Sequence, residues 1–476
     1  MAMTRVEDVF GVNKNISTYL ERENVDGKMK SALDEKKHVV VYGSSQQGKT
    51  LLLDRLQIEK KIKINIGNNF KVVDIYKAII RQLEVLLTNK TVSTESSGST
   101  ALAGADLSAK VAFFGKASAK IEGGFDSNEM TEIEADHVEY DLSQAQSIVE
   151  ILIKENITHK ILIDDFHYLE LEEQKKLAKD LKVFYENEIQ FIILGVWKEK
   201  NWLLQHNPEL ADRLELIPVE PWTPENFKEI IRKGSEDLGI SFQEEVINDI
   251  IQSSLGNVGI LQDICKICCV NSKRRNDGIV TSEDFEEAIS EKRISYSTHN
   301  IAILNKVATY NEKGVLFLPY YLIRVILEVD ISRLKEGLTK KYLQYQIQQR
   351  HYDKRDEKVR PSEMTKFLNN SLIQMQSNLS IEPLIFDYNL ESEIFSIIDS
   401  RLIFYIANTE VNKMVESLEI PEELDQILLE EGTDIKVLVQ IPDDKKQEYK
   451  MYIKALGLQD TDESKIEFIK ALEKVR

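Results

Sequence analysis

Cysteine is scarce in this chain. Only 3 of the 476 residues are cysteine, too few for a disulfide framework, so we expect the fold to depend on buried apolar side chains in a reducing compartment. The three lie close together as Cys265, Cys268 and Cys269. Two further ligands of matching spacing are missing, and the segment has the composition of an apolar helix. We therefore interpret the cysteines as buried thiols rather than as a metal or redox site.

Long apolar runs and positive charge are also scarce. No stretch is long and apolar enough to span a membrane, and the first residues, MAMTRVEDVF, lack a signal-peptide pattern. We expect a cytoplasmic protein without a membrane partner. The formal net charge of −19 argues against broad attraction to nucleic acid, although a local basic patch could still bind it. With 42% hydrophobic and 30% charged residues, the chain resembles ordinary globular proteins of two to four domains.

A phosphate-binding loop is the most informative motif that is present. Residues 38–50 read HVVVYGSSQQGKT, a strand-like apolar run followed by the complete pattern GxxxxGK[ST]. The two glycines let the backbone curl so that its N–H groups point at phosphate oxygens. We expect Lys49 to reach the β and γ phosphates and the Thr50 hydroxyl to help hold Mg²⁺. The predicted nucleotide contacts here are Gly43, Ser44, Ser45, Gln46, Gln47, Gly48, Lys49, Thr50 and Leu51.

Two carboxylates end a second strand-like run. Residues 159–170 read HKILIDDFHYLE, and Asp164 and Asp165 follow the apolar residues 161–163. We expect Asp164 to orient Mg²⁺ or its water shell, as the Walker B carboxylate does in P-loop enzymes. Asp165 is then positioned to polarise the attacking water. The alternative interpretation is an exposed strand end, which is common in α/β proteins.

Strand-like and helix-like segments alternate around these motifs. Strands are predicted at 39–42, 62–66, 137–141, 160–163 and 190–195, and helices at 72–87, 143–155 and 172–187. Such alternation predicts an α/β fold with a mainly parallel sheet covered on both faces. We assign residues 36–220 to this P-loop core and residues 1–35 to an N-terminal adaptor with a helix at 25–36.

Residues 90–135 interrupt the alternation. They begin with the run TVSTESSGST and continue with many small residues. We interpret them as an inserted β-hairpin or arm, with a disordered loop as the alternative. Insertions on such cores often contact partners, which draws attention to Phe113 and Phe114.

Three further parts follow the core. Residues 221–298 read as a helical lid that begins with Thr223 as cap and Pro224 at the first helical position, and GNVG at 256–259 opens another helix inside it. Residues 299–410 combine helices at about 319–343 and 361–375 with two strand-like runs at 384–388 and 394–398, which suggests a winged helix. Residues 411–476 read as an acidic, helical C-terminal module.

With the loop, the carboxylate pair, the lid and the hairpin in this order, the chain resembles AAA+ or STAND-type P-loop ATPases. Its organisation is most similar to the origin-recognition-like branch. It also resembles an uncharacterised group of bacterial ATP-binding proteins that carry YGSSxQGKT, a DDFHYL-like strand end and a GVWxExN segment, present here at 42–50, 164–169 and 195–201. The resemblance covers roughly residues 15–405 and implies ATP and Mg²⁺ as ligands.

The resemblance also implies roles for three residues outside the motifs. Arg213 stands where such ATPases place an arginine finger, which neutralises charge on the γ phosphate of a neighbouring protomer. A surface ion pair with Asp212 or Glu215 is the alternative. Tyr19 and Arg22 lie in the region before the loop that commonly packs on adenine, although both would also suit helix packing.

Three departures from the family pattern favour slow turnover. Gly195-Val196-Trp197 occupies the place of the polar sensor after the fourth strand, with Asn201 as a possible substitute. GNVG occupies the place of the arginine that often opens a late lid helix. Asp165 stands where glutamate is more common.

Two functions of different classes follow from these observations. The first is an ATP-dependent switch that forms a homo-oligomer and acts on a protein partner, for which the STAND resemblance suggests bacterial antiphage defence. The second is a DNA-associated ATPase of the origin-recognition or transposition-regulator type, with DNA bound through residues 350–376. Basic residues precede the candidate recognition helix, which itself offers polar side chains: Arg350, Lys354, Arg355, Lys358 and Arg360, then Lys366, Asn369, Asn370 and Gln374. A third reading is nucleotide binding without meaningful hydrolysis.

Overall fold

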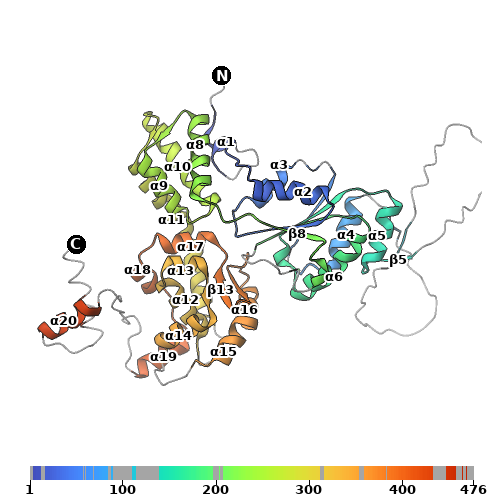
Figure 1. Ribbon diagram of the computed structural model, residues 1–476. Helices are drawn as coiled ribbons and strands as arrows, with labels where there is room; N and C mark the ends of the chain where they lie inside the picture. The colour runs from blue at the N-terminus through green and yellow to red at the C-terminus, as the bar shows by residue number, and fades with distance from the viewer. Residues whose placement is uncertain are drawn as a thin grey trace, which may run out of the picture. The chain divides into compact units, whose positions relative to one another are not determined.

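The protein is represented by a computed structural model with two compact units (Figure 1). The structure describes residues 4–11, 17–56, 58, 60–67, 69–83, 87–88, 110–113, 139–196, 203, 207–310, 316–352, 359–381, 383–431, 446–456, 464 and 468. Unit 1 comprises Met1–Ser241 and Gly256–Lys266, and unit 2 comprises Phe242–Leu255 and Ile267–Arg476. The finer domain boundaries expected from the sequence stay predictions.

A five-stranded parallel sheet forms the centre of unit 1. Its strands are β1 (His38–Tyr42), β2 (Lys61–Asn65), β6 (Lys160–Asp164), β7 (Phe191–Gly195) and β8 (Leu214–Pro218), in the order β2-β6-β7-β1-β8. The central strands β1 and β7 are buried along their whole length. The predicted α/β core with a mainly parallel sheet is confirmed, and it has the architecture of a P-loop nucleotide-binding fold.

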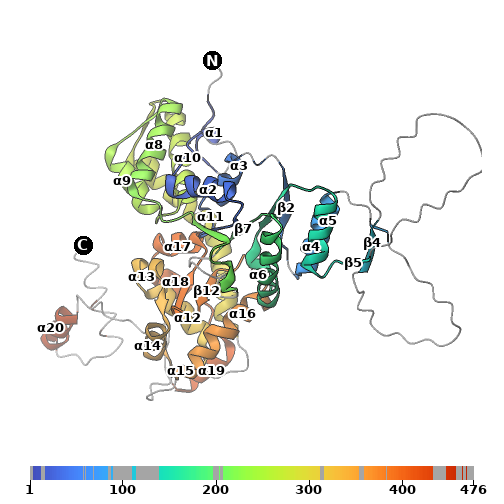
Figure 2. The same ribbon diagram turned by 45° about the vertical axis from the view of Figure 1, so that its right-hand side comes forward.

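Helices cover both faces of this sheet because alternate strand residues point to opposite sides. On one face, Val40, Ile64 and Ile163 pack against α4 (Val72–Gln82), α5 (Ala145–Lys154) and α6 (Leu171–Glu186). Figures 1 and 2 show these three helices side by side. On the other face, Val39 and Val41 pack with residues of α2 (Lys28–Asp34) and α3 (Lys49–Arg55). Two separate apolar layers therefore hold the loop that follows β1.

One predicted strand of the core is wrong. Residues 137–141 were expected in the parallel sheet, but β5 (Glu139–Asp141) pairs antiparallel with β4 (Lys110–Phe113), which pairs with β3 (Leu87–Thr88). The fifth parallel strand is β8, where Glu215 and Pro218 interrupt the apolar pattern because β8 lies at the edge of the sheet. The expected insertion at 90–135 is described only at 110–113, and Phe114 lies outside the described residues.

Short elements connect these parts of unit 1. They are α1 (Val6–Val9), a π-helical turn η1 (Glu23–Gly27), and the 3₁₀ turns η2 (Phe166–Tyr168) and η3 (Pro208–Leu210). The helix predicted at 25–36 thus corresponds to η1 and α2. Helix α8 (Pro224–Leu238) begins as predicted, since Thr223 caps it by accepting a hydrogen bond from the Asn226 N–H and Pro224 occupies its first position.

The further helices of the predicted lid segment are α9 (Glu244–Ser253), α10 (Val258–Arg275) and α11 (Ser282–Ala308), with short strands β9 (Ser241–Phe242) and β10 (Ile279–Val280). Helix α10 follows GNVG, as predicted. Cys265, Cys268 and Cys269 lie in it with buried thiols, and the predicted burial is confirmed. Burial raises the pKa of the Cys269 thiol to about 12.

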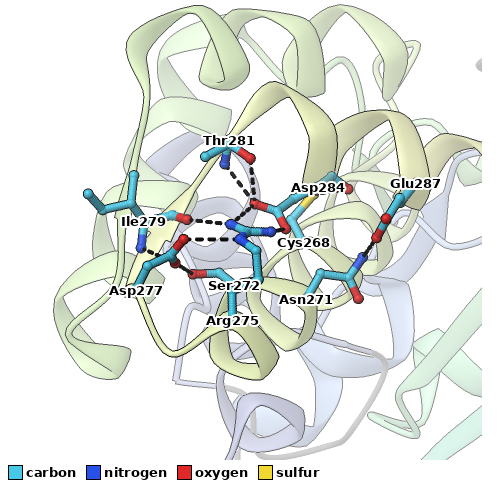
Figure 3. Close-up of polar contacts among 9 residues, drawn as sticks. All are labelled: Cys268, Asn271, Ser272, Arg275, Asp277, Ile279, Thr281, Asp284 and Glu287. Atoms are coloured by element: carbon cyan, nitrogen blue, oxygen red, sulfur yellow. Dashed lines mark hydrogen bonds and ion pairs between the residues drawn. The ribbon is translucent and has the colours of Figure 1, made fainter.

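An ion pair fixes the turn between α10 and α11 in unit 2 (Figure 3). The Arg275 guanidinium contacts the carboxylate of Asp284, which is fully buried, and also donates to Asp277 and to the Ile279 carbonyl. Asp284 in turn accepts hydrogen bonds from the Thr281 N–H and hydroxyl at the start of α11. The same carboxylate therefore caps α11 and neutralises the charge of Arg275, the last residue of α10.

Unit 2 continues with helices around a small antiparallel sheet. Its elements are α12 (Leu318–Glu328), α13 (Ile331–Glu336), β11 (Leu338–Thr339), α14 (Lys340–Arg350), α15 (Pro361–Lys366), η4 (Phe367–Ser371), α16 (Leu372–Asn378), β12 (Phe386–Asn389), β13 (Ile394–Ile397) and α17 (Ser400–Ala407). The predicted hairpin is present as β12 and β13, and β11 pairs with β13. The single helix predicted at 319–343 is wrong: Asp330 caps a new helix, and Gly337 adopts a φ of +99° that ends it.

Helices α18 (Val411–Glu416), α19 (Glu422–Glu431) and α20 (Lys446–Leu456) follow. They agree with the helical character predicted for 411–476 in the part that the structure describes. Within the same described part of the chain, no helix combines the length and the apolar composition that crossing a membrane requires.

Candidate functional site

The phosphate loop lies between β1 and α3, at the carboxyl end of the central strand. Gly43 and Gly48 have φ values of +151° and +85°, and a Cβ on Gly43 would lie 2.6 Å from a methyl carbon of Val219. Gln46 is also left-handed, with a φ of +62°. These backbone conformations produce the tight curl that the motif predicts.

Lys49 is buried in this loop and held by backbone oxygens. Its Nζ donates to the carbonyl oxygens of Gly43 (2.9 Å) and Ser44 (2.7 Å). Burial lowers the pKa of Lys49 to about 8, and the nearby carboxylates of Glu220, Asp164 and Asp165 oppose that shift. The ammonium is thus close to the carboxylate pair, as the two motifs together require.

Asp164 and Asp165 lie at the carboxyl end of β6, two strands away from β1 in the sheet. Asp164 is mostly buried, and its Oδ1 accepts a hydrogen bond from the Asp165 N–H, while its Oδ2 lies 2.8 Å from Lys63 Nζ. Asp165 adopts a left-handed φ of +57°, so the chain turns sharply after the strand. Burial, followed by the charge of Asp164, raises the pKa of Asp165.

His167 lies close to the same charges. Both ring nitrogens are buried without a hydrogen-bond partner, and the ring packs against that of Tyr168 at a tilt of 36°, with centroids 4.3 Å apart. Burial, reinforced by Lys49, lowers the pKa of His167 to about 4. The imidazole is therefore neutral near pH 7, when it can both donate and accept one hydrogen bond.

A cavity of about 360 Å³ adjoins the loop, within the range of small-molecule sites. Residues Gln46–Leu52 line the cavity together with Tyr19 and Arg22, which brings these sequence-predicted residues together. Trp222 also lines it, although sequence reasoning missed that residue. The Arg22 guanidinium carbon lies 3.6 Å from the centroid of the Trp222 ring, and its Nη1 donates to the Val219 carbonyl.

Tyr19 and Arg22 are both held by Asp26. The Tyr19 hydroxyl donates to Asp26 Oδ1, and the Arg22 N–H donates to Oδ2 at 2.8 Å. Burial, followed by the hydrogen bond to Asp26, raises the pKa of Tyr19.

Glu220 is a second residue that sequence reasoning missed. Its carboxylate accepts hydrogen bonds from the Ser44 N–H (2.7 Å), from the Ser44 hydroxyl (2.9 Å) and from Gln47 Nε2 (2.7 Å). Glu220 follows β8 and lies 176 positions from Ser44 in the chain, so no local pattern announces the contact. Only the pairing of β8 with β1 brings Glu220 to the loop.

Arg213 lies away from the phosphate loop of its own chain. It precedes β8, whose first residue Leu214 pairs with His38 at the start of β1, whereas the loop follows the other end of β1. The strand length separates the two by about 13 Å or more. The guanidinium of Arg213 lies 3.8 Å from the carboxylate of Glu186, so its ion-pair partner is Glu186 rather than Asp212 or Glu215. The Arg213 side chain is 29% exposed.

The sensor substitute named above lies outside the described residues, since Trp197 and Asn201 are not described. Of the basic residues at 350–360, Lys354, Arg355 and Lys358 are not described either. Arg350 is buried, and its Nε donates to Glu328 at 2.8 Å, so its expected contact with phosphate is wrong. The polar residues predicted on the following helix are exposed: Lys366, Asn369, Asn370 and Gln374.

No family model matches the chain, and no curated protein matches it. The chain is similar to the solved structure of Cdc6p from Pyrobaculum aerophilum, at 12% identity over 87% of this chain and 100% of that one, with a TM-score of 0.38. It is similar to the Orc1 protein of Aeropyrum pernix in complex with DNA, at 12% identity over 89% and 98%, with a TM-score of 0.39. It is also similar to a RuvB protein of Thermotoga maritima, at 14% identity over 84% of this chain and 96% of that one, with a TM-score of 0.36. At such values, the functional argument depends on the chain's own residues.

Proposed function

We propose that this protein is an ATP-binding, slowly hydrolysing P-loop ATPase of AAA+ or STAND type, which forms a homo-oligomer and acts as a switch on a protein partner. The observation that carries the proposal is the convergence of three features in unit 1. These are the curled phosphate loop with buried Lys49, the carboxylate pair at the end of β6, and the adjoining cavity. The resemblance to STAND ATPases suggests antiphage defence as the setting.

The donor set suits a nucleoside triphosphate with Mg²⁺. Lys49 carries the charge that the β and γ phosphates require, and the loop N–H groups add uncharged donors. The Thr50 hydroxyl and the Asp164 carboxylate offer hard oxygen ligands of the kind that Mg²⁺ prefers. When bound, Mg²⁺ supplies charge neutralisation on the phosphate oxygens.

Asp165 is the group that we assign to the attacking water. Its raised pKa makes the carboxylate a better proton acceptor than an ordinary aspartate. The side chain is one methylene shorter than that of glutamate, so its reach to a water beside the γ phosphate is shorter as well. We therefore propose slow hydrolysis, which suits a switch better than a motor.

The part of the cavity lined by Tyr19, Arg22 and Trp222 is the proposed adenine site. Tyr19 and the stacked pair of Arg22 and Trp222 present flat polarizable surfaces, and Gln262 lies among the lining residues with Val258 and Gly259. A purine bound there would stack rather than rely on charge. The preference for adenine over guanine rests on the resemblance alone.

The position of Arg213 supports the proposed oligomer. Because Arg213 lies at the opposite end of the strands from its own loop, it acts at a γ phosphate only if the loop belongs to a second copy. An arginine supplied from another chain accelerates hydrolysis by about a thousandfold or more in related enzymes. Within its own chain, Arg213 Nη1 donates to the Glu209 carbonyl at 2.5 Å and Nη2 lies 3.8 Å from the Glu186 carboxylate, and both contacts would have to be exchanged for the phosphate of a second copy.

The experiment is the rate of ATP hydrolysis per protomer as a function of protein concentration, for wild type and Arg213→Ala. We expect a specific rate that rises with concentration and falls about a hundredfold or more in the variant. Lys182→Ala is a matched control, because Lys182 pairs with Glu209 on the same surface. A flat, slow rate that is indifferent to Arg213 contradicts the shared site and leaves a monomeric switch.

A DNA-associated ATPase is the second candidate. The observation that favours it is the exposed polar face of α15 to α16 beside the β12–β13 hairpin, an arrangement that suits a winged helix. The loss of Arg350 from the basic set weakens this candidate. Binding to duplex DNA that falls steeply with salt, and that is reduced in Arg360→Ala and Lys366→Ala, would favour it over a protein partner.

A further inference from the structure

The phosphate loop is held from outside by residues distant in the sequence. Ser44 and Gln47 donate to Glu220, and both are almost fully buried. Three donors converge on one carboxylate, and such charge-assisted hydrogen bonds are stronger than neutral ones. Of the loop, the cavity lining includes the residues from Gln46 onward but not Ser44, and it does not include Glu220. Glu220 therefore lies behind the loop rather than among the groups that face a ligand.

The segment that opens α10 holds the same loop from another side. Asn257 Nδ2 donates to the Ser45 carbonyl at 2.9 Å, and the Gly259 N–H donates to the Gln46 carbonyl at 3.0 Å. Gln47 links the two sides, since its Nε2 also donates to the Gly256 carbonyl at 3.2 Å. A Cβ on Gly259 would lie 2.8 Å from the Gln46 carbonyl oxygen, so only glycine permits this approach.

These contacts offset an unfavourable backbone conformation. Gln46 has a φ of +62°, a region that a residue with a Cβ adopts only at a cost in free energy. A loop that carried this strain without external contacts would populate other conformations when no nucleotide is bound. The apparent affinity for a ligand is then the intrinsic affinity multiplied by the fraction of loops that are in the binding-competent conformation.

We propose that Glu220, Gln47, Asn257 and Gly259 form a brace that holds the phosphate loop in its binding conformation before a nucleotide arrives. Glu220 and Asn257 are positioning residues, since they contact the backbone of the loop and do not line the cavity. The inference rests on the proposed nucleotide site for its effect on affinity. Its effect on the loop itself is measurable in the ligand-free protein.

The first test is amide hydrogen exchange of the ligand-free protein, in wild type and Glu220→Gln. The glutamine keeps an acceptor oxygen but loses the negative charge. Its new NH₂ group cannot accept a hydrogen bond from the NH₂ group of Gln47. We expect exchange at the Ser44 and Gln47 amides to accelerate at least about tenfold, with the amides of the buried strand β7 unchanged. Glu215→Gln, on the same strand β8 but near its far end, is the matched control.

The second test compares ATP with adenosine. Because the brace acts on the phosphate loop, we expect Glu220→Gln to weaken ATP binding about tenfold and to leave adenosine binding within twofold of wild type. A merely structural defect would weaken both ligands alike. Ser44→Ala removes only the hydroxyl contact, and we expect a decrease in ATP affinity of about threefold, which keeps the test available if Glu220→Gln does not fold.

The outcomes separate the brace from the proposed function. Unchanged exchange and unchanged ATP affinity in folded Glu220→Gln overturn the brace, and so does an equal loss of ATP and adenosine binding. Faster exchange in a protein whose wild type binds no ATP supports the brace and contradicts the nucleotide site instead.

Discussion

Lys63 Nζ lies 2.8 Å from Asp164 Oδ2, so the carboxylate assigned to Mg²⁺ already has a cationic partner. The two residues come from the adjacent strands β2 and β6, and Lys63 is 41% exposed whereas Asp164 is 16% exposed. An ammonium in this position neutralises part of the carboxylate charge and occupies space that a metal ion bound to Asp164 would need. Mg²⁺ must therefore displace Lys63 or share Asp164 with it.

This relationship predicts the effect of Lys63→Met on metal affinity. Removing the competing ammonium should lower the Mg²⁺ concentration for half-maximal stimulation of ATP binding by about two- to fivefold, the range expected for an exposed ion pair. Lys61→Met, on the same exposed face of β2, is the control. An unchanged or higher Mg²⁺ midpoint in Lys63→Met would show that the pair does not compete with the metal.

Asp165→Asn tests the assignment of the base. We expect hydrolysis to fall by about a hundredfold or more, since amides do not accept a proton, while ATP affinity stays within about threefold of wild type. Because the pKa of Asp165 is raised, the wild-type rate should fall on acidification at a higher pH than it would for an ordinary aspartate. Phosphate release, with the exposed Asp212→Asn as control, is the measurement; a normal rate in Asp165→Asn excludes this role.

The contiguous motifs of the site could be read from the sequence alone. The strand, the loop and the start of α3 occupy residues 38–55 without interruption, and Asp164 and Asp165 directly end β6. In both cases the chemistry and the secondary structure that positions it are neighbours in the chain. The structure adds the burial and the charge environment of these motifs, which together raise the pKa of Asp165 and lower that of Lys49.

The residues that hold the loop could not be predicted, because their contacts are made across the sheet. Glu220 reaches Ser44 only because β8 pairs with β1, and β8 itself was not among the predicted strands. Trp222 likewise lies in the short segment between β8 and α8, which belongs to neither sequence motif. Arg350 read as part of a basic surface, since its partner Glu328 lies 22 positions away on α12.

The burial of His38 should make the stability of the protein depend on pH. It is fully buried, its Nε2 contacts the Leu181 carbonyl, its Nδ1 accepts from the Phe191 N–H, and burial lowers its pKa to about 4. The unfolded chain, with a pKa near 6.5, binds the proton first, so stability is fully present above pH 6.5 and is lost as the pH falls towards 4. The shift corresponds to about 3 kcal/mol.

Urea unfolding between pH 7 and pH 4 measures this effect. His38→Asn should show a flatter pH dependence than wild type, with part of the slope remaining because the pKa of His167 is lowered in the same way. His299→Asn, at an exposed position, serves as control. Equal slopes for His38→Asn and wild type would mean that protonation of His38 does not limit stability.

Removal of the Glu328 carboxylate should greatly reduce the stability of unit 2. Its carboxylate accepts hydrogen bonds from Arg324 Nε and Arg350 Nε, both at 2.8 Å, and the two guanidiniums are almost fully buried. Glu328→Ala leaves two buried cations without their carboxylate, which should cost about 3–5 kcal/mol of unfolding free energy. The exposed Glu336→Ala should cost less than about 0.5 kcal/mol. A cost below about 1 kcal/mol for Glu328→Ala would contradict the pairing.

The most direct test of the central claim is the affinity for ATP with Mg²⁺, measured by calorimetry for wild type and Lys49→Ala. The account predicts saturable binding of one nucleotide per chain to the wild type. It also predicts a loss of at least about tenfold in Lys49→Ala, because the variant lacks the ammonium that reaches the phosphates. Absence of binding by the folded wild type, or equal affinity in the variant, would contradict the assignment of the loop as a nucleotide site.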